Sequence, residues 1–316
     1  MNAVLAVLFV LCWSSGFIGA KLSAGDADPL TVLTWRFLPL AVVLVVGAAL
    51  FGRARWRGVG SRTLRRQAVV GALSQTGYLL TVYQAIGLGV STGTTALIDG
   101  TQPLVVAVLA GPLLGQHVAP RQWWGLLLGL AGVVIVTAGD ATSASGVSWW
   151  AYLVPFAGML SLVAATFLES RAPTDTDPVV SMTVHCATSA VLFTALAAYA
   201  GEVSPPTAAS FWWSVAWLIV LSTFGGYGLY WLVLRRSGVT RVNALMFLMA
   251  PVTAIWGAAV FGEPFGPLTG LGLLLGLGAV ALVFRTPPRG RGAEAVPTDE
   301  QSPEPERVRG SARLRR

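Results

Sequence analysis

The stretch that decides the fold is Gly125-Leu126-Leu127-Leu128-Gly129-Leu130, which recurs unchanged as Gly272-Leu273-Leu274-Leu275-Gly276-Leu277. Each copy lies in an apolar run of about 20 residues, the length that an α-helix needs to cross a hydrocarbon layer of about 30 Å. Of the 316 residues, 54% are hydrophobic and only 11% are charged. An ordinary soluble domain carries about 25% charged residues. The chain is therefore predicted to be an all-α integral membrane protein.

Ten apolar runs bounded by charged residues, Pro or Gly are long enough to be membrane helices. They cover residues 3–20, 30–51, 68–88, 92–115, 121–139, 149–168, 178–200, 211–233, 242–261 and 266–284. The connections between them are mostly short. We therefore expect ten transmembrane helices.

The second half of the sequence repeats landmarks of the first half at a spacing of about 148 residues. Asp28-Pro29 matches Asp177-Pro178, Gly77-Tyr78 matches Gly226-Tyr227, Gly89-Val90-Ser91 matches Gly238-Val239-Thr240, and Pro103 matches Pro251. A repeat of five helices, an odd number, crosses the membrane with opposite polarity in its second copy. Many secondary transporters have such inverted repeats and bind substrate near the midplane between them. The expected organisation is a first repeat at 1–139, a linker at 140–148, a second repeat at 149–285, and a disordered cytoplasmic tail at 286–316.

The basic residues indicate the orientation. Lys21 is the only lysine, so 20 of the 21 basic residues are Arg. With a cytoplasmic N-terminus, one side of the membrane receives nearly all of them: Arg53, Arg55, Arg57, Arg62, Arg65, Arg66, Arg121, Arg171, Arg235, Arg236, Arg241 and those of the tail. Since cytoplasmic loops are enriched in Lys and Arg, both termini are predicted to be cytoplasmic in a multi-pass cell-membrane protein. The Arg clusters interrupt apolar runs, which argues against a nucleic-acid-binding face.

Several motifs resemble those of the EamA family in the drug/metabolite transporter superfamily. They are Trp13-Ser14-Ser15-Gly16-Phe17-Ile18-Gly19-Ala20-Lys21, Pro29 followed by Trp35-Arg36-Phe37, and, in each half, a helix with a mid-span Pro followed by a Gly-rich final helix. The family's Pro helix ends in Gly-Glu; the second half keeps Gly262-Glu263, whereas the first half has Gly115-Gln116. The resemblance covers residues 1–285. It implies export or exchange of small metabolites, amino-acid-like or drug-like, by alternating access.

Charged residues within the apolar runs are candidates for function, because each costs at least about 2.5–3.5 kcal/mol at bilayer depth. Asp99 has no acidic counterpart in the second half, so the fold of a repeat does not require it. It is a candidate for substrate binding or for coupling transport to protons. Arg36 is expected at a similar depth, and the alternative role of Asp99 is a permanent ion pair with Arg36. His185, the counterpart of Arg36, is expected to be hydrogen-bonded, with proton relay as its alternative.

Aromatic and polar residues on the expected inter-repeat helices are predicted to line the substrate cavity, since such pockets combine apolar walls with a few polar groups. With Asp99, the set is Trp13, Tyr78, Tyr83, Gln102, Tyr227, Tyr230, Trp231 and Asn243. Packing contacts between helices are the alternative. Pro103 and Pro251 are candidate gating kinks. The Gly motifs at 125–130 and 272–277 allow close helix contact, within the fold or in a dimer.

Two other classes of function remain as alternatives. Gly89-Val90-Ser91-Thr92-Gly93 fits the pattern of a hydrolase nucleophile elbow, but it lies between two membrane helices rather than after a strand. An enzyme is therefore not predicted, and no catalytic residue, cofactor or metal is expected. Cys12 and Cys186 lie in apolar runs, so neither a disulfide nor a metal site is expected. A non-transporting scaffold or receptor is the second alternative. The expected partners are a small-molecule metabolite, the lipid bilayer and, for a coupled transporter, protons.

Overall fold

Helices α2 (Pro29–Phe51) and α9 (Pro178–Ala200) begin in the same way. The Asp28 side chain accepts a hydrogen bond of 2.8 Å from the backbone N–H of Leu30, and the Asp177 side chain accepts one of 2.8 Å from that of Val179. Each Asp satisfies a backbone donor that has no partner within its helix, and the following Pro has the backbone torsion of a first helical residue. The Asp-Pro pairs that match between the two halves therefore start equivalent helices.

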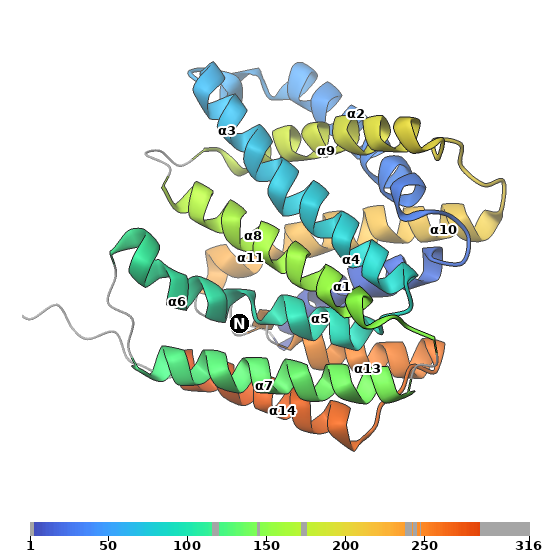
Figure 1. Cartoon of the computed structure of the whole chain (residues 1–316). Coiled ribbons are helices and arrows are strands. Elements are labelled where there is room, and N and C mark those ends of the chain that lie inside the picture. Colours follow the sequence, from blue (N-terminus) through green and yellow to red (C-terminus); the bar gives the residue numbers. More distant parts are fainter. Residues whose placement is uncertain are drawn as a thin grey trace, which may run out of the picture. The chain divides into compact units, whose positions relative to one another are not determined.

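The computed structural model describes residues 3–115, 120–143, 146–171, 176–237, 242, 245–246 and 248–284. Over these ranges the regular structure is entirely helical, without a strand (Figure 1). Besides α2 and α9, the elements are α1 (Ala3–Ser23), η1 (Arg53–Trp56), α3 (Ser61–Gly71), η2 (Ala72–Gly77), α4 (Tyr78–Gly87), α5 (Thr92–Gly100), α6 (Gln102–Leu114), α7 (Pro120–Ser143), η3 (Trp149–Leu153), α8 (Val154–Ser170), α10 (Ala209–Trp217), η4 (Leu218–Tyr227), α11 (Gly228–Ser237), α13 (Met249–Phe261) and α14 (Pro267–Phe284). The predicted tail at 286–316 lies outside the described residues.

Seven helical segments of the described chain are long and apolar enough to cross a membrane. They are Ala3–Ser23, Pro29–Phe51, Thr92–Leu113, Pro120–Thr142, Trp149–Ser170, Pro178–Ala200 and Ala209–Tyr230, and the shorter apolar helices are Met249–Phe261 and Pro267–Ala279. Large apolar side chains face outward, with Val42 56% and Val43 59% exposed on α2 and Val191 69% exposed on α9. A lipid-facing surface explains this exposure, since soluble proteins rarely expose wide apolar patches. The prediction of an all-helical membrane protein is confirmed.

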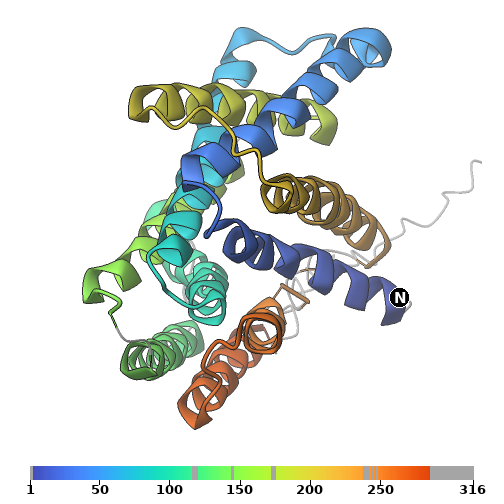
Figure 2. The ribbon, with the colours of Figure 1, turned by 90° about the vertical axis from the view of Figure 1, so that its right-hand side faces the viewer.

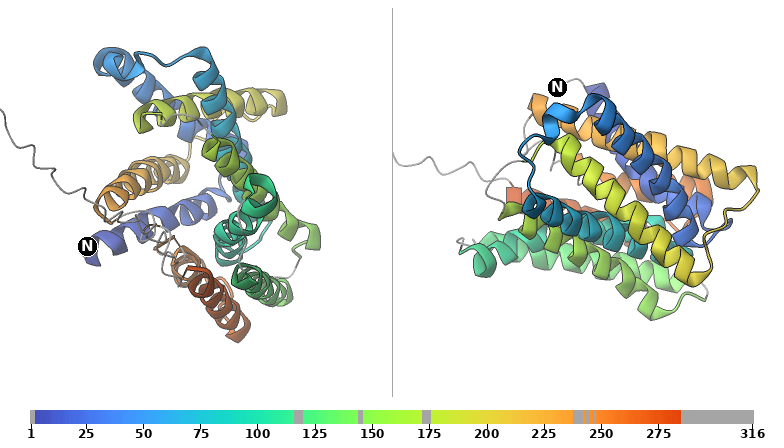
Figure 3. Two further views of the ribbon diagram at one scale, coloured as in Figure 1. Left: turned by 90° about the vertical axis from the view of Figure 1, so that its left-hand side faces the viewer. Right: turned by 90° about the horizontal axis from the view of Figure 1, so that it is seen from above.

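Helices from the two halves of the sequence pack against one another. Helix α7 lies along α14, and α2 lies beside α9 (Figure 3). The first of these contacts is close, because a Cβ atom added to Gly132 would meet the Gly272 carbonyl oxygen at 2.6 Å, and one added to Gly272 would meet that of Gly132 at 2.6 Å. Gly272 belongs to the second copy of the repeated motif, so this motif makes a helix contact within the fold.

Helix α1 is the central element. It contacts η4, α10 and α11 on one side and α13 on another (Figure 2), and it also touches α4 and α5. Phe9, Phe17 and Ile18 of α1 are at most 4% exposed. A helix buried on several faces carries apolar residues all round and shows no amphipathic pattern, which explains why α1 looks in sequence like a lipid-facing helix.

Two long helices contain a π-helical turn in their middle. Helix α3 continues through the π-helix η2 into α4, and α10 continues through the π-helix η4 into α11. The two π-helices end at Gly77 and Tyr227, within the matched Gly-Tyr pairs of the two halves. Such turns are rare and often occur at functional sites. Nothing in the sequence analysis predicted them.

Candidate functional site

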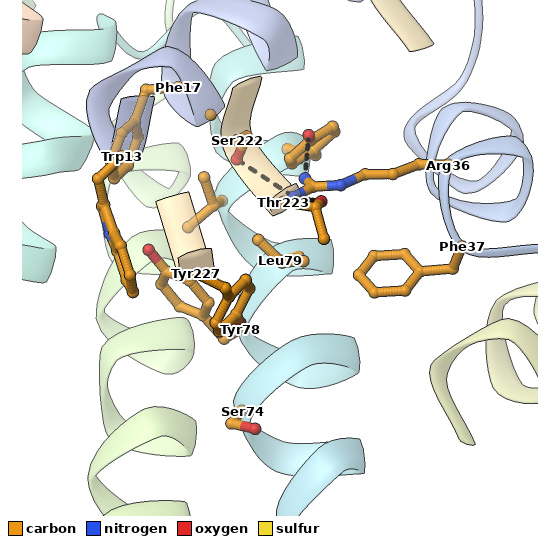
Figure 4. Close-up of a pocket in the computed structure, with 13 residues that line it drawn as sticks. Trp13, Phe17, Arg36, Phe37, Ser74, Tyr78, Leu79, Ser222, Thr223 and Tyr227 are labelled. Carbon is orange, nitrogen blue, oxygen red and sulfur yellow. Dashed lines mark hydrogen bonds between the residues drawn. The ribbon is translucent and has the colours of Figure 1, made fainter. Parts of the chain in front are cut away.

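A cavity of about 60 Å³ lies between helices of both halves (Figure 4). Segments α1, α2, η2 and α4 line it from the first half, and η4 lines it from the second. The lining residues are Trp13, Gly16, Phe17, Arg36, Phe37, Ser74, Tyr78, Leu79, Val82, Tyr83, Ser222, Thr223 and Tyr227. A buried water needs roughly 10–15 Å³ of such volume, so the cavity has room for a few water molecules.

Arg36 is the charged group of the cavity wall. Its residue is only 3% exposed. Its Nη1 donates a hydrogen bond of 2.8 Å to the Tyr83 hydroxyl, and its Nη2 donates to the hydroxyls of Ser222 at 3.2 Å and Thr223 at 3.1 Å. The guanidinium carbon also lies 5.3 Å from the centre of the Phe37 ring. Arg36 therefore joins α2 to α4 and to η4 through neutral partners.

The π-helix η4 supplies two of the three hydroxyls that accept from Arg36, and η2 contributes Ser74 to the cavity wall. In η4 the Thr223 hydroxyl donates a hydrogen bond of 3.1 Å to the carbonyl oxygen of Leu218, five residues earlier. Its single proton is then engaged, so its oxygen lone pairs are free to accept from Arg36. In η2 the carbonyl oxygen of Leu73 accepts a hydrogen bond of 2.8 Å from the Ser161 hydroxyl of α8. Ser74, the next residue, lines the cavity.

Aromatic rings form the apolar part of the wall. The ring centres of Trp13 and Tyr227 lie 5.7 Å apart at an angle of 53°. Trp13 also contacts Phe9 at 5.7 Å and Tyr230 at 5.9 Å. The cavity thus has one polar corner around Arg36 and an aromatic side around Trp13, the mixture of surfaces found in pockets for amphiphilic ligands.

Asp99 lies beside the cavity and contacts it through Tyr78. The Tyr78 hydroxyl donates a hydrogen bond of 2.8 Å to Asp99 Oδ2, while the buried Asp99 Oδ1 has no hydrogen-bond partner in the described part of the chain. Among the contacts of the described residues, Asp99 and Arg36 form no ion pair. The pair considered from the sequence is absent because Arg36 donates to hydroxyls on α4 and η4 instead.

The regular helix is interrupted just after Asp99. Helix α5 ends at Gly100, and α6 begins at Gln102 with Pro103 in its first turn. Pro lacks a backbone N–H, so it fits a first turn and interrupts a continuous helix. The Thr101 hydroxyl donates to the Ile98 carbonyl oxygen at 2.7 Å, which satisfies one of the acceptors at the break. Pro251 likewise lies in the first turn of α13.

The structure brings four of the predicted cavity residues into the lining: Trp13, Tyr78, Tyr83 and Tyr227. Gln102 instead donates a hydrogen bond of 3.1 Å to the Thr166 hydroxyl of α8, and Tyr230 packs against Phe9 and Trp13. Trp231 belongs to α11, but its side chain lies outside the described part of the chain, as does the whole of Asn243.

Eight further residues line the cavity that were not predicted from the sequence: Gly16, Phe17, Phe37, Ser74, Leu79, Val82, Ser222 and Thr223. A signal for two of them was present. At the spacing that matches Gly77-Tyr78 to Gly226-Tyr227, Ser74 corresponds to Thr223, so both halves carry a hydroxyl residue at this position of the π-helix. Small polar residues at equivalent positions of the two repeats therefore indicate cavity-lining positions that a search for aromatic residues does not find.

Two polar clusters link the halves at opposite ends of the helices. At one end, Glu263 accepts hydrogen bonds from the Thr92 backbone N–H at 3.0 Å and from its hydroxyl at 2.6 Å, and Lys21 Nζ lies 3.7 Å from Glu263 Oε1. Asp140 accepts a hydrogen bond of 3.1 Å from the neighbouring Ser91 N–H. We call Lys21, Thr92 and Glu263 the Glu263 cluster.

At the other end, Gln67 Nε2 donates to both carboxylate oxygens of Glu169 at 3.0 Å, and His185 Nε2 lies 2.7 Å from Gln67 Oε1. Arg66 Nε lies 3.9 Å from Glu169 Oε2. We call these residues the Glu169 cluster. His185 is hydrogen-bonded, as expected. Within the described ranges no three His, Cys, Asp or Glu residues are arranged to hold a metal ion.

Comparison with known proteins agrees with this architecture. The sequence matches the EamA-like transporter family twice, over residues 1–138 and over residues 149–285. A solved crystal structure that is 22% identical matches the fold with a TM-score of 0.60, covering 88% of this chain and 95% of its own.

The relatives include a probable amino-acid metabolite efflux pump of Escherichia coli, 24% identical over 291 residues that cover 89% of this chain and 92% of the pump. An uncharacterized inner membrane transporter of the same species, YedA, is 22% identical over 279 residues, which cover 88% of this chain and 89% of YedA. A chloroplastic WAT1-related protein of Arabidopsis thaliana is 26% identical over 289 residues, which cover 86% of this chain but 66% of the plant protein. The chain belongs to the EamA-like transporter family and is a membrane transporter.

Proposed function

We propose that the cavity around Arg36 is the substrate site of a secondary transporter that exports or exchanges small amphiphilic metabolites by alternating access. The observation that carries this proposal is that the cavity lies between the two segments that match the family. Residues of α1, α2 and α4 form one side, and Ser222, Thr223 and Tyr227 of η4 form the other. A site between repeats becomes exposed to either side when one repeat moves against the other.

The proposal includes ten membrane crossings in two inverted repeats, at 1–139 and 149–285, with both termini in the cytoplasm. Three observations support it. The family matches each half separately. The π-helices η2 and η4 occupy equivalent positions of the two halves. The Arg residues gather on one side of the proposed crossings.

The size of the cavity supports a mechanism in which helices move. Pockets for drug-sized ligands have volumes of roughly 300–1,000 Å³, whereas this cavity measures about 60 Å³. A metabolite therefore requires the lining helices to separate. The Glu263 cluster and the Glu169 cluster each join residues of both halves, so we propose that they close the two ends in turn. We propose that the helices bend at Pro103 and Pro251, which lie in the first turns of α6 and α13.

We propose Asp99 as the site through which protons couple to transport. Burial in a low-dielectric interior disfavours the charged form of a carboxyl group, so proton uptake and release can accompany a change of exposure. The hydrogen bond between Tyr78 and Asp99 connects this carboxyl group to the cavity wall.

A variant that fills the cavity tests the substrate site. Ser74 lines the cavity, so Ser74→Phe should place a ring in the available space. In proteoliposomes, Ser74→Phe should abolish the uptake of whichever solutes of a radiolabelled amino-acid and carboxylate panel the unaltered protein transports. The control is Val191→Phe, at a position 69% exposed on the apolar surface of α9. Transport by Ser74→Phe at the unaltered rate would refute the assignment of the site.

A further inference from the structure

No carboxylate of the described residues neutralises the charge of Arg36. Arg36 lies within the span Pro29–Phe51 and is 3% exposed. Within the described ranges, no Asp or Glu oxygen is paired with its guanidinium group. Its hydrogen-bond partners are the hydroxyls of Tyr83, Ser222 and Thr223. A buried charge normally has a partner of opposite charge, since hydroxyl dipoles replace only part of the lost hydration.

One donor of the guanidinium group is also unused. Arg36 Nε is buried and has no hydrogen-bond partner among the residues that the structure describes. Arg36 lines the cavity, and Figure 4 shows its guanidinium group beside Ser222 and Thr223. Nε and Nη2 form one edge of the planar group, an edge that matches the two oxygens of a carboxylate.

From the buried charge and the unused donor we infer that Arg36 binds the carboxylate group of an anionic amphiphilic substrate. The carboxylate receives one hydrogen bond from Nε and one from Nη2, where it displaces one of the two hydroxyls of η4. This inference rests on the proposed function, because it assigns the chemical class of the substrate to the same cavity. The bound anion neutralises the charge that the fold leaves unpaired.

The composition of the wall favours a singly charged carboxylate over a phosphate group. Arg36 is the only charged residue among those that line the cavity, whereas a phosphate dianion requires more positive charge. The rings of Trp13 and Tyr227 provide the surface for an apolar substrate body. A purely structural role for Arg36, holding α2 to η4, predicts no preference for anions.

Three probes that share a phenyl body and differ in the terminal group distinguish carboxylate binding by Arg36 from a purely structural role. They are radiolabelled 3-phenylpropanoate, its neutral amide, and the corresponding 3-phenylpropylammonium ion. Binding is measured on the full-length protein in lipid nanodiscs. We expect the carboxylate to bind at least about tenfold more tightly than the amide, because hydrogen bonds to charged groups are the stronger ones. Arg36→Gln should remove this preference, and Arg36→Lys should restore part of it. The control Arg62→Gln changes an exposed residue of α3 and should leave the preference intact.

A second variant keeps the inference testable if Arg36→Gln does not fold. Ser222→Ala combined with Thr223→Val retains Arg36 but removes both hydroxyls with which a carboxylate competes. The ratio of carboxylate to amide affinity should then rise. An unchanged or lower ratio contradicts the inference. Displacement of the probe by chloride as readily as by unlabelled 3-phenylpropanoate also contradicts it, because it indicates a site for any small anion.

Failure of this inference differs from failure of the proposed function. If the three probes bind equally, or if the carboxylate does not bind at concentrations up to about 10 mM, the inference is wrong. The proposed function survives that result as long as Ser74→Phe still abolishes transport. If Ser74→Phe transports normally, the cavity is not the substrate site and both proposals fail.

Discussion

The hydroxyl group of Tyr78 donates a hydrogen bond of 2.8 Å to Asp99 Oδ2, while the same tyrosine lines the cavity. The contact joins α4 to the last turn of α5, just before the helix is interrupted at Thr101. Asp99 Oδ1 is buried and accepts no hydrogen bond. Tyr78 therefore connects Asp99 directly to the cavity wall.

The first prediction concerns proton coupling. Asp99→Asn should abolish transport driven by an imposed pH gradient while preserving solute exchange, because the amide cannot take up and release a proton. Both activities are measured in proteoliposomes. A response to the gradient equal to that of the unaltered protein, with normal expression, would exclude the coupling role and leave facilitated diffusion as the simpler mechanism.

A second prediction concerns the donor to Asp99. Tyr78→Phe keeps the ring in the cavity wall but removes a hydrogen bond to an acidic group, so it should destabilise the protein by about 1.5–3 kcal/mol. The matched control is Tyr152→Phe, because the buried Tyr152 hydroxyl has no hydrogen-bond partner within the described ranges. Thermal unfolding of both purified variants provides the measurement. An equal loss of stability in the two variants would contradict the importance of the Tyr78 contact.

The third prediction concerns closure at the end that holds the Glu263 cluster. Glu263→Ala removes the acceptor for the first backbone N–H of α5, a contact of the capping type that is worth about 0.5–2 kcal/mol. This loss should raise the fraction of molecules whose cavity is open at the end of the Glu263 cluster by a factor of about 2–30. Cysteine labelling of Ser74→Cys, in a background without Cys12 and Cys186, measures the exposure of the cavity to an impermeant reagent.

Glu202→Ala serves as the control for this experiment, because the side chain of Glu202 is exposed on the α9–α10 connection. The labelling rate of Ser74→Cys should rise with Glu263→Ala and stay constant with Glu202→Ala. A rate that is unaffected by Glu263→Ala would show that the Glu263 cluster does not control access to the cavity.

The fourth prediction concerns orientation. Arg57 and Ala209 are both exposed, and the proposed topology places Arg57 inside the cell and Ala209 outside. In the background without Cys12 and Cys186, an external impermeant thiol reagent should label Ala209→Cys and spare Arg57→Cys. The reverse pattern of labelling would invert the proposed topology.

The fifth prediction concerns the contact between α7 and α14. A Cβ atom at Gly272 would meet the backbone oxygen of Gly132 at 2.6 Å, whereas Gly270, on the same helix, has nothing within 4 Å. Gly272→Ala should therefore destabilise the protein by about 1–3 kcal/mol through overpacking. Gly270→Ala should be neutral or stabilising, since Ala is the better helix former. Thermal unfolding of the two purified variants distinguishes overpacking at the Gly132–Gly272 contact from a general intolerance of α14 to substitution.

The sequence by itself determined the class of the protein, the main helix starts and the family. These features depend on local chemistry: 20 apolar residues are long enough to cross the bilayer wherever they pack, and Asp28 caps the helix that directly follows it. Arg36 and Asp99 were recognisable as functional candidates for the same reason, since a charge within an apolar run is costly in any arrangement of the helices.

Only the tertiary structure decided which of these groups meet. Arg36 and Thr223 are 187 residues apart in sequence, and no pattern along either helix indicates that they are neighbours. The ion pair between Arg36 and Asp99 was an alternative that similar depth in the membrane allowed, but depth does not specify the rotation of each helix about its axis. In a helix that is apolar all round, hydropathy does not distinguish the lipid-facing side from the buried side. The packing of α2 against α4 and η4 places Arg36 among the hydroxyls of Tyr83, Ser222 and Thr223 rather than beside a carboxylate.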